Sequence, residues 1–128
     1  MGEAELALRD LDFVAEARLA GESGGAEVSF QGNADSAIAP RLASFVTDLH
    51  EQLVKTARRQ ITVDIRALEQ LHTSCFNVLV SWLGLVSELA PDERYQLTFT
   101  TNGAIPWQKR SLHTLSCFAT DLVTVESS

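Results

Sequence analysis

The stretch that decides the fold is Ile61 to Phe76, Ile-Thr-Val-Asp-Ile-Arg-Ala-Leu-Glu-Gln-Leu-His-Thr-Ser-Cys-Phe. It opens with apolar residues that alternate with polar ones, a period of two that is typical of a strand. Ser74 then stands where a helix should begin. After Ser74 the apolar residues change from strand spacing to helical spacing. They form one stripe that comprises Val78, Leu79, Trp82, Leu85, Val86 and Leu89.

The strand period and the helix period recur on both sides of this stretch. A turn over 22–25 joins two strands as a hairpin, and a helix precedes each later strand. Strands that alternate with helices call for a largely parallel sheet, so the sequence predicts an α/β fold with βαβαβαβ order after the first strand. The expected strands are 13–20, 26–31, 60–66, 95–101 and a short one at 122–125, and the expected helices are 37–57, 74–89 and 106–118.

Composition narrows the class of protein. The 128 residues suit a single domain, in which residues 1–10 are disordered or form an edge segment. A net charge of −7 argues against nucleic acid or an anionic membrane as the partner. No apolar run is long enough to span a membrane, and the acidic N-terminus is unlike a signal peptide. Two cysteines are too few for a disulfide framework, so we expect a cytoplasmic protein of bacterial type with reduced thiols.

Three short motifs follow one another at characteristic separations, and together they resemble the STAS family (sulfate transporter and anti-sigma factor antagonist domain). Small stand-alone bacterial members of that family are the most similar. The resemblance covers roughly residues 26–125 and implies the STAS fold. The motifs are Gly32-Asn33-Ala34-Asp35 with Ala39-Pro40 and Leu42, then Asp64-Ile65 with Leu68, Leu71 and Ser74, and finally Leu115-Ser116-Cys117-Phe118 with Asp121-Leu122.

The resemblance also implies a function. In the family, a serine at the position of Ser74 is phosphorylated by a partner kinase that is also an anti-sigma factor. The unphosphorylated protein sequesters that kinase and frees a sigma factor. The implied protein is a signalling module and not an enzyme; it binds no cofactor, because the partner uses the ATP. By the same resemblance Ser74 is the phosphoacceptor, and Asp35, Asn33, Thr73 and Cys75 contact the partner.

Departures from the family pattern surround the serine. The acidic residue of the family motif Asp-Ser-Ser-Gly is His72 here, its first serine is Thr73 and its glycine is Cys75. A second family glycine is Cys117. The chain also ends at Ser128, too soon for the C-terminal helix that family members usually carry. If these changes mean that phosphorylation has been lost, the protein is a non-switching scaffold or a transporter-associated STAS subunit.

Simpler structural roles compete with the functional ones. Ser74 or Thr73 can act as the N-cap of the helix, and Asp35 as an Asx residue at the entry of the preceding helix. A nucleophile–base pair of His72 and Ser74 is disfavoured, because residues two apart around such a corner seldom face each other. The chain also lacks the Gly-x-Ser-x-Gly elbow of serine hydrolases.

The remaining candidates are cysteines, histidines and residues of the second helix. Cys75 can be a small core residue, or a thiol-based sensor if the helix dipole lowers its pKa. A bridge to Cys117 is not expected, because the helix that ends there runs away from Cys75. No His, Cys or Asp spacing suggests a metal site. Trp82 and Gly84 fit the core and a close packing of the second helix.

Overall fold

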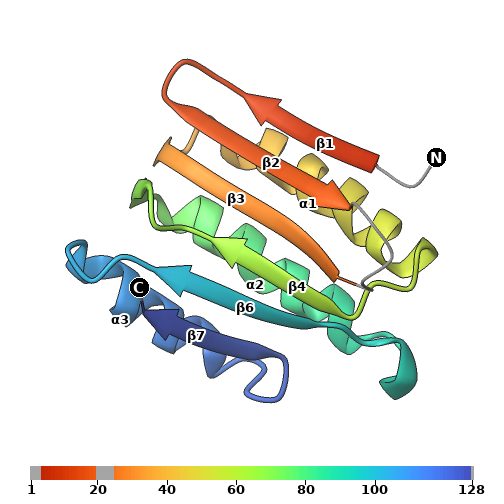
Figure 1. Cartoon of the computed structure of the whole chain (residues 1–128). Helices are drawn as coiled ribbons and strands as arrows, with labels where there is room; N and C mark the ends of the chain where they lie inside the picture. The colour runs from red at the N-terminus through yellow and green to blue at the C-terminus, as the bar shows by residue number, and fades with distance from the viewer. Residues whose placement is uncertain (1–3, 20–24, 128) are drawn as a thin grey trace.

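A computed structural model describes residues 4–19 and 25–127 as one sheet covered by helices (Figure 1). The sheet has the order β1-β2-β3-β4-β6-β7, and β5 pairs with the end of β3 beyond β4. The elements are β1 (Ala4–Arg9), β2 (Phe13–Leu19), β3 (Gly25–Ala34), α1 (Ala39–Lys55), β4 (Gln60–Asp64), β5 (Leu68–Leu71), α2 (Thr73–Ser87), the 3₁₀ turn η1 (Pro91–Glu93), β6 (Gln96–Thr101), α3 (Pro106–Ser116) and β7 (Val123–Ser127).

The pairing of the strands confirms the predicted fold class. β1–β2 and β2–β3 are antiparallel, and all later pairings are parallel. The predicted hairpin is therefore β2–β3, although most of its predicted turn at 22–25 lies outside the described residues. Every later predicted strand and helix is present within a few residues of its expected bounds. The helix α3 begins at its predicted residue and α2 one residue early. The helix α1 begins two residues late, at Ala39, because Ser36 to Ile38 form a turn.

All three helices lie behind the sheet in Figure 1, so the sheet has one covered and one open face. Alternate residues of β2, β3, β4 and β6 are buried beneath the helices. On the open face, register partners form a polar row across four strands: Glu16, Ser29, Asp64 and Thr100. This alternation is why the strands show a period of two in the sequence.

Two strands were not predicted. Residues 4–9 form β1, which resolves the expectation for residues 1–10 in favour of an edge strand for the part described. β5 is only four residues long and buries only Leu68 completely, so no alternation marks it. It pairs with β3 through a register shift at Gly32/Asn33, which carries β3 three residues past its predicted end at position 31.

The interior of α2 agrees with one expectation and contradicts another. Trp82 is fully buried, as predicted. Gly84 was expected to allow close packing, and this is wrong: it lies on the exposed side of the helix, with no atom within 4 Å of where a Cβ would be. Because an α-helix has 3.6 residues per turn, the residue two positions after a core tryptophan faces a different side of the helix.

A buried polar chain joins the two central helices to the sheet. Trp82 Nε1 donates to the Tyr95 hydroxyl (2.7 Å), and His50 Nδ1 lies 2.6 Å from the same oxygen. Since that oxygen accepts from Trp82, its own hydrogen is available to His50 Nδ1, which requires a neutral imidazole. Burial lowers the pKa of His50, opposed by the nearby Glu51 and Glu88 carboxylates.

We expect this histidine to make stability depend on pH. Its folded-state pKa lies below the unfolded value, so the folded protein binds fewer protons. Stability is therefore greatest above the unfolded pKa of about 6.5 and falls as the pH decreases below it. His50→Gln keeps a neutral acceptor and should flatten urea-measured stability between about pH 7 and 5. His113→Gln, at an exposed site, is the control and should leave the slope unchanged; an unaltered slope in His50→Gln contradicts the prediction.

Candidate functional site

The carboxyl ends of β3 and β5 bring two of the sequence motifs together. The His72 N–H donates to the carbonyl of Ala34 (2.8 Å), and the thiol of Cys75 donates to the carbonyl of Asp35 (3.2 Å). The loop that carries Asp35 therefore packs directly on the first turn of α2, which carries Ser74. Parallel topology accounts for this, because β3 and β5 run parallel and their carboxyl ends lie at the same edge of the sheet.

The cap of α2 differs from the prediction. His72 is the N-cap, with an extended backbone (φ −65°, ψ 151°), and its Nδ1 accepts the N–H of Ser74 (3.0 Å). Thr73 and Ser74 are the first two helical residues, so neither is the cap. The prediction failed because a histidine ring nitrogen accepts at the distance where the hydroxyl or carboxylate of Ser, Thr or Asp usually does.

The hydroxyl of Ser74 is held by the same nitrogen. Its Oγ lies 2.8 Å from His72 Nδ1, so the two side chains do face each other, contrary to the prediction. Because the Ser74 N–H already donates to Nδ1, that nitrogen carries a lone pair and Oγ–H donates to it as well. The imidazole thus holds the hydroxyl in place.

Ser74 is half-buried and lines a groove between α1 and α2 of about 180 Å³. Thr73 beside it is exposed. No residue that lines the groove is charged: the set is Ala43, Val46, Thr47, Ser74, Asn77, Val78, Ser81, Trp82 and Leu85. A charged group attached to Oγ would therefore stand at the rim of an uncharged surface.

The loop before α1 presents the acidic candidate. Asp35 is exposed, and its Oδ1 accepts the N–H of Ala37 (3.0 Å), which confirms its role in an Asx turn. It does not cap α1 itself, whose N-cap is Ile38 without a side-chain bond. Asn33 is half-buried, and its N–H donates to the carbonyl of Asp12 in the β1–β2 turn (2.7 Å).

Cys75 belongs to the core. Its side chain is 0% exposed, and burial raises the pKa of its thiol, opposed by a hydrogen bond with Ser74. It therefore has no surface to offer a partner, and the expected partner contact of Cys75 is not compatible with this position. A raised pKa also disfavours a reactive thiolate. Cys75 and Cys117 are both free, as expected.

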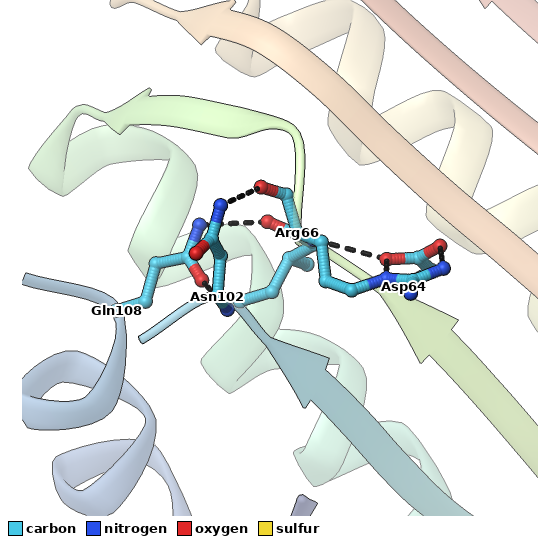
Figure 2. Close-up of polar contacts among 5 residues, drawn as sticks. Asp64, Arg66, Asn102 and Gln108 are labelled. Atoms are coloured by element: carbon cyan, nitrogen blue, oxygen red, sulfur yellow. Dashed lines mark hydrogen bonds and ion pairs between the residues drawn. The ribbon is translucent and has the colours of Figure 1, made fainter. Parts of the chain in front are cut away.

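Gln108, which was not among the predicted site residues, clamps the segment that leads into the site (Figure 2). Gln108, in the first turn of α3, is 0% exposed. Its amide donates to the carbonyls of Ile65 (2.7 Å) and Leu68 (2.8 Å) and accepts the N–H of Asn102 (2.7 Å). A polar residue in the apolar stripe of Ile105, Leu112 and Leu115 was the available signal.

Figure 2 also shows how Asp64 and Arg66 are held. Asp64 accepts from the Arg66 N–H (3.0 Å), Nε (3.0 Å) and Nη2 (2.9 Å), and this side-chain bonding lowers the pKa of the carboxyl. The carbonyl of Arg66 in turn accepts from Asn102 Nδ2 (3.2 Å). Asp64 thus shapes the turn after β4.

Two further findings concern metal binding and membrane insertion. Within residues 4–19 and 25–127, no three His, Cys, Asp or Glu side chains are grouped as metal ligands. Among the helices of the same residues, none combines the length and the apolar character needed to cross a membrane.

Comparison with known proteins identifies the fold. No protein-family model and no curated protein sequence matches the chain. Among solved structures, it matches a chain from the complex of the diguanylate cyclase SiaD with its activator SiaC from Pseudomonas aeruginosa: TM-score 0.70, 16% identity, 96% of this chain and 99% of that chain covered. It also matches an anti-sigma factor antagonist from Mycobacterium paratuberculosis: TM-score 0.57, 16% identity, 94% and 86% covered. SiaC has a STAS-like fold and the antagonist is of STAS type, so the chain has the STAS-like fold that the sequence motifs implied.

Proposed function

We propose that this protein is a non-enzymatic regulatory module of the bacterial cytoplasm, which binds a protein partner and is switched by phosphorylation of Ser74. The observation that carries the proposal is the place of the Ser74 hydroxyl. It lies in the first turn of α2, beside the exposed Asp35 loop and at the rim of an uncharged groove. The fold is shared with an anti-sigma factor antagonist and with the structure of an enzyme–activator complex, which supports a role in protein binding.

Phosphorylation would change this corner without unfolding it. Esterified Oγ has no hydrogen to donate, so its bond to His72 Nδ1 is lost. The phosphate instead meets N–H groups and the positive end of the α2 dipole, which favour a dianion. It also adds about two negative charges beside an uncharged groove. Repulsion of acidic partner groups and steric bulk, rather than refolding, would then release the partner.

The favoured partner is an anti-sigma factor that is also a serine kinase. It would supply the ATP and contact Asp35, Asn33 and Thr73. A second candidate is an enzyme that the unphosphorylated protein activates, because the match to a chain of the cyclase–activator complex has a TM-score of 0.70 against 0.57 for the antagonist. Both candidates use the same surface and the same switch.

The first test is intact mass and phosphopeptide mapping of the protein from its native host. We expect a population carrying one phosphate on Ser74 that disappears in Ser74→Ala. Ser87→Ala, the same change at an exposed serine at the other end of α2, is the matched control and should keep the phosphate, because Ser87 lies outside the proposed partner surface. Phosphate on Thr73, or none under several growth conditions, would overturn the switch and favour the scaffold or transporter-subunit alternative.

A further inference from the structure

Among the described residues, β1 pairs only with β2, so its other side is an open strand edge of the sheet (Figure 1). The Asp10 N–H donates to Phe13 O (2.8 Å), so Asp10, Leu8 and Leu6 direct their backbone groups toward β2. The backbone groups of Ala7 and Arg9 consequently point away from the sheet. In agreement, the carbonyl of Arg9 accepts from Arg41 of α1 (3.1 Å), not from β2.

This edge carries few of the devices that keep strand edges apart. β1 reads Ala-Glu-Leu-Ala-Leu-Arg, with no proline and no lysine. Ala7 at its centre is exposed and small, and Leu6 is only half-buried. Such an edge is a template for pairing with another strand.

The sequence of β1 is complementary to itself when it is read in the opposite direction. In an antiparallel pair centred on Ala7, Glu5 lies opposite Arg9 of the second copy, and Leu6 lies opposite Leu8. Positions 5, 7 and 9 are the ones whose backbone groups point outward, so their hydrogen bonds fall in register, with the Arg9 carbonyl shared between Arg41 and the second copy. Opposite charges and apolar pairs facing each other across strands are both stabilising.

A groove beside this edge also carries charges that would be complementary to those of a second copy. It has a volume of about 470 Å³ and lies between β1 and one stripe of α1. Within that stripe, Arg41 and Asp48 stand on either side of Ser44. A two-fold axis through the centre of β1 would therefore bring Arg41 toward Asp48 of the second copy.

We propose that two copies of this chain pair through β1 and form a continuous antiparallel sheet across a two-fold axis. The opposite edge, β7, does not offer this pairing, because its sequence Val-Thr-Val-Glu-Ser carries an acidic residue and no cation. The paired interface leaves Ser74 outside it, since α2 packs on α1 and not on β1. A six-residue strand and one groove make a small interface, so the expected dissociation constant is about micromolar.

Sedimentation velocity of the full chain over a range of concentrations tests the dimer. The wild type should move from monomer to dimer and stop there. Arg9→Glu should weaken dimerisation by about tenfold or more, because it sets two acidic residues opposite each other. Ala7→Pro should do the same by removing the central outward N–H. Arg110→Glu, an exposed α3 position with the same charge change, should dimerise like the wild type.

The double exchange Glu5→Arg/Arg9→Glu separates pairing from folding. It restores opposite charges between copies, so dimerisation should recover relative to Arg9→Glu. Within one copy it does not restore the Arg9–Glu16 ion pair, and it sets an arginine at position 5 opposite Arg18. A purely structural role of these residues therefore predicts a further loss. A wild type that stays monomeric, assembly beyond the dimer, or no recovery in the double variant would overturn the proposal.

Discussion

Replacing Gln108 with leucine should destabilise the protein by about 2 kcal/mol or more. Leucine fits the apolar stripe of α3, but it cannot replace any of the three hydrogen bonds that Gln108 makes in a fully buried position. The substitution leaves the Leu68 carbonyl and the Asn102 N–H without this partner, whereas the Ile65 carbonyl still accepts the N–H of Leu68 (3.0 Å). Each buried unsatisfied group costs about 1–3 kcal/mol, less whatever water entry recovers.

Urea unfolding monitored by tryptophan fluorescence would measure this loss. The matched control is Lys109→Leu, a neighbouring exposed position on the same helix, which should change stability by no more than about 0.5 kcal/mol. Because Gln108 holds the segment between β4 and β5, amide exchange should also accelerate at Ile65 to Leu68. A loss below about 1 kcal/mol would mean that the amide does not clamp this segment.

Periodic burial decides which parts of the fold a single sequence can predict. The alternation in 60–66 and the stripe of α2 report burial directly, and those elements were predicted correctly. β5 was missed because its four residues become a strand only through pairing with the shifted end of β3. Such long-range pairing leaves little periodic trace in so short a segment.

The candidate site also has features that the sequence predicts and features that it does not. That Asp35 and Ser74 share an edge follows from parallel topology, so it was predictable. The contact between His72 and Ser74 was not, because it depends on an extended His72 backbone that turns the ring back over the helix start. The burial of Cys75 decides between core and surface roles. The sequence favoured the core role, because Cys75 stands four and seven residues before Leu79 and Trp82 and so continues the apolar stripe of α2.

Replacing Gly32 with alanine should destabilise the protein by about 2–5 kcal/mol. Gly32 has φ +93°, a conformation that costs a residue with a Cβ about 1–2 kcal/mol. A Cβ there would also lie 2.0 Å from the carbonyl oxygen of Asp12, which is backbone and cannot rotate away. Overpacking of this kind costs about 1–3 kcal/mol more.

The control is Gly84→Ala, the same chemical change in the opposite setting. Gly84 lies inside α2 with no atom near the new methyl group, so this variant should gain about 0.5–1 kcal/mol. If both glycine variants lost stability alike, backbone conformation and the Asp12 contact would not be the cause in Gly32→Ala.

The structural change expected in Gly32→Ala is also localised. The clash must move either the β1–β2 turn or the end of β3, which carries Asn33 and leads into the Asp35 loop, because Asn33 donates to the same Asp12 carbonyl. Either movement displaces Asp35 relative to α2. Binding of the regulatory partner should therefore weaken in Gly32→Ala even at temperatures where the variant is fully folded, while Gly84→Ala, on the far side of α2 from that loop's contacts, should bind like the wild type.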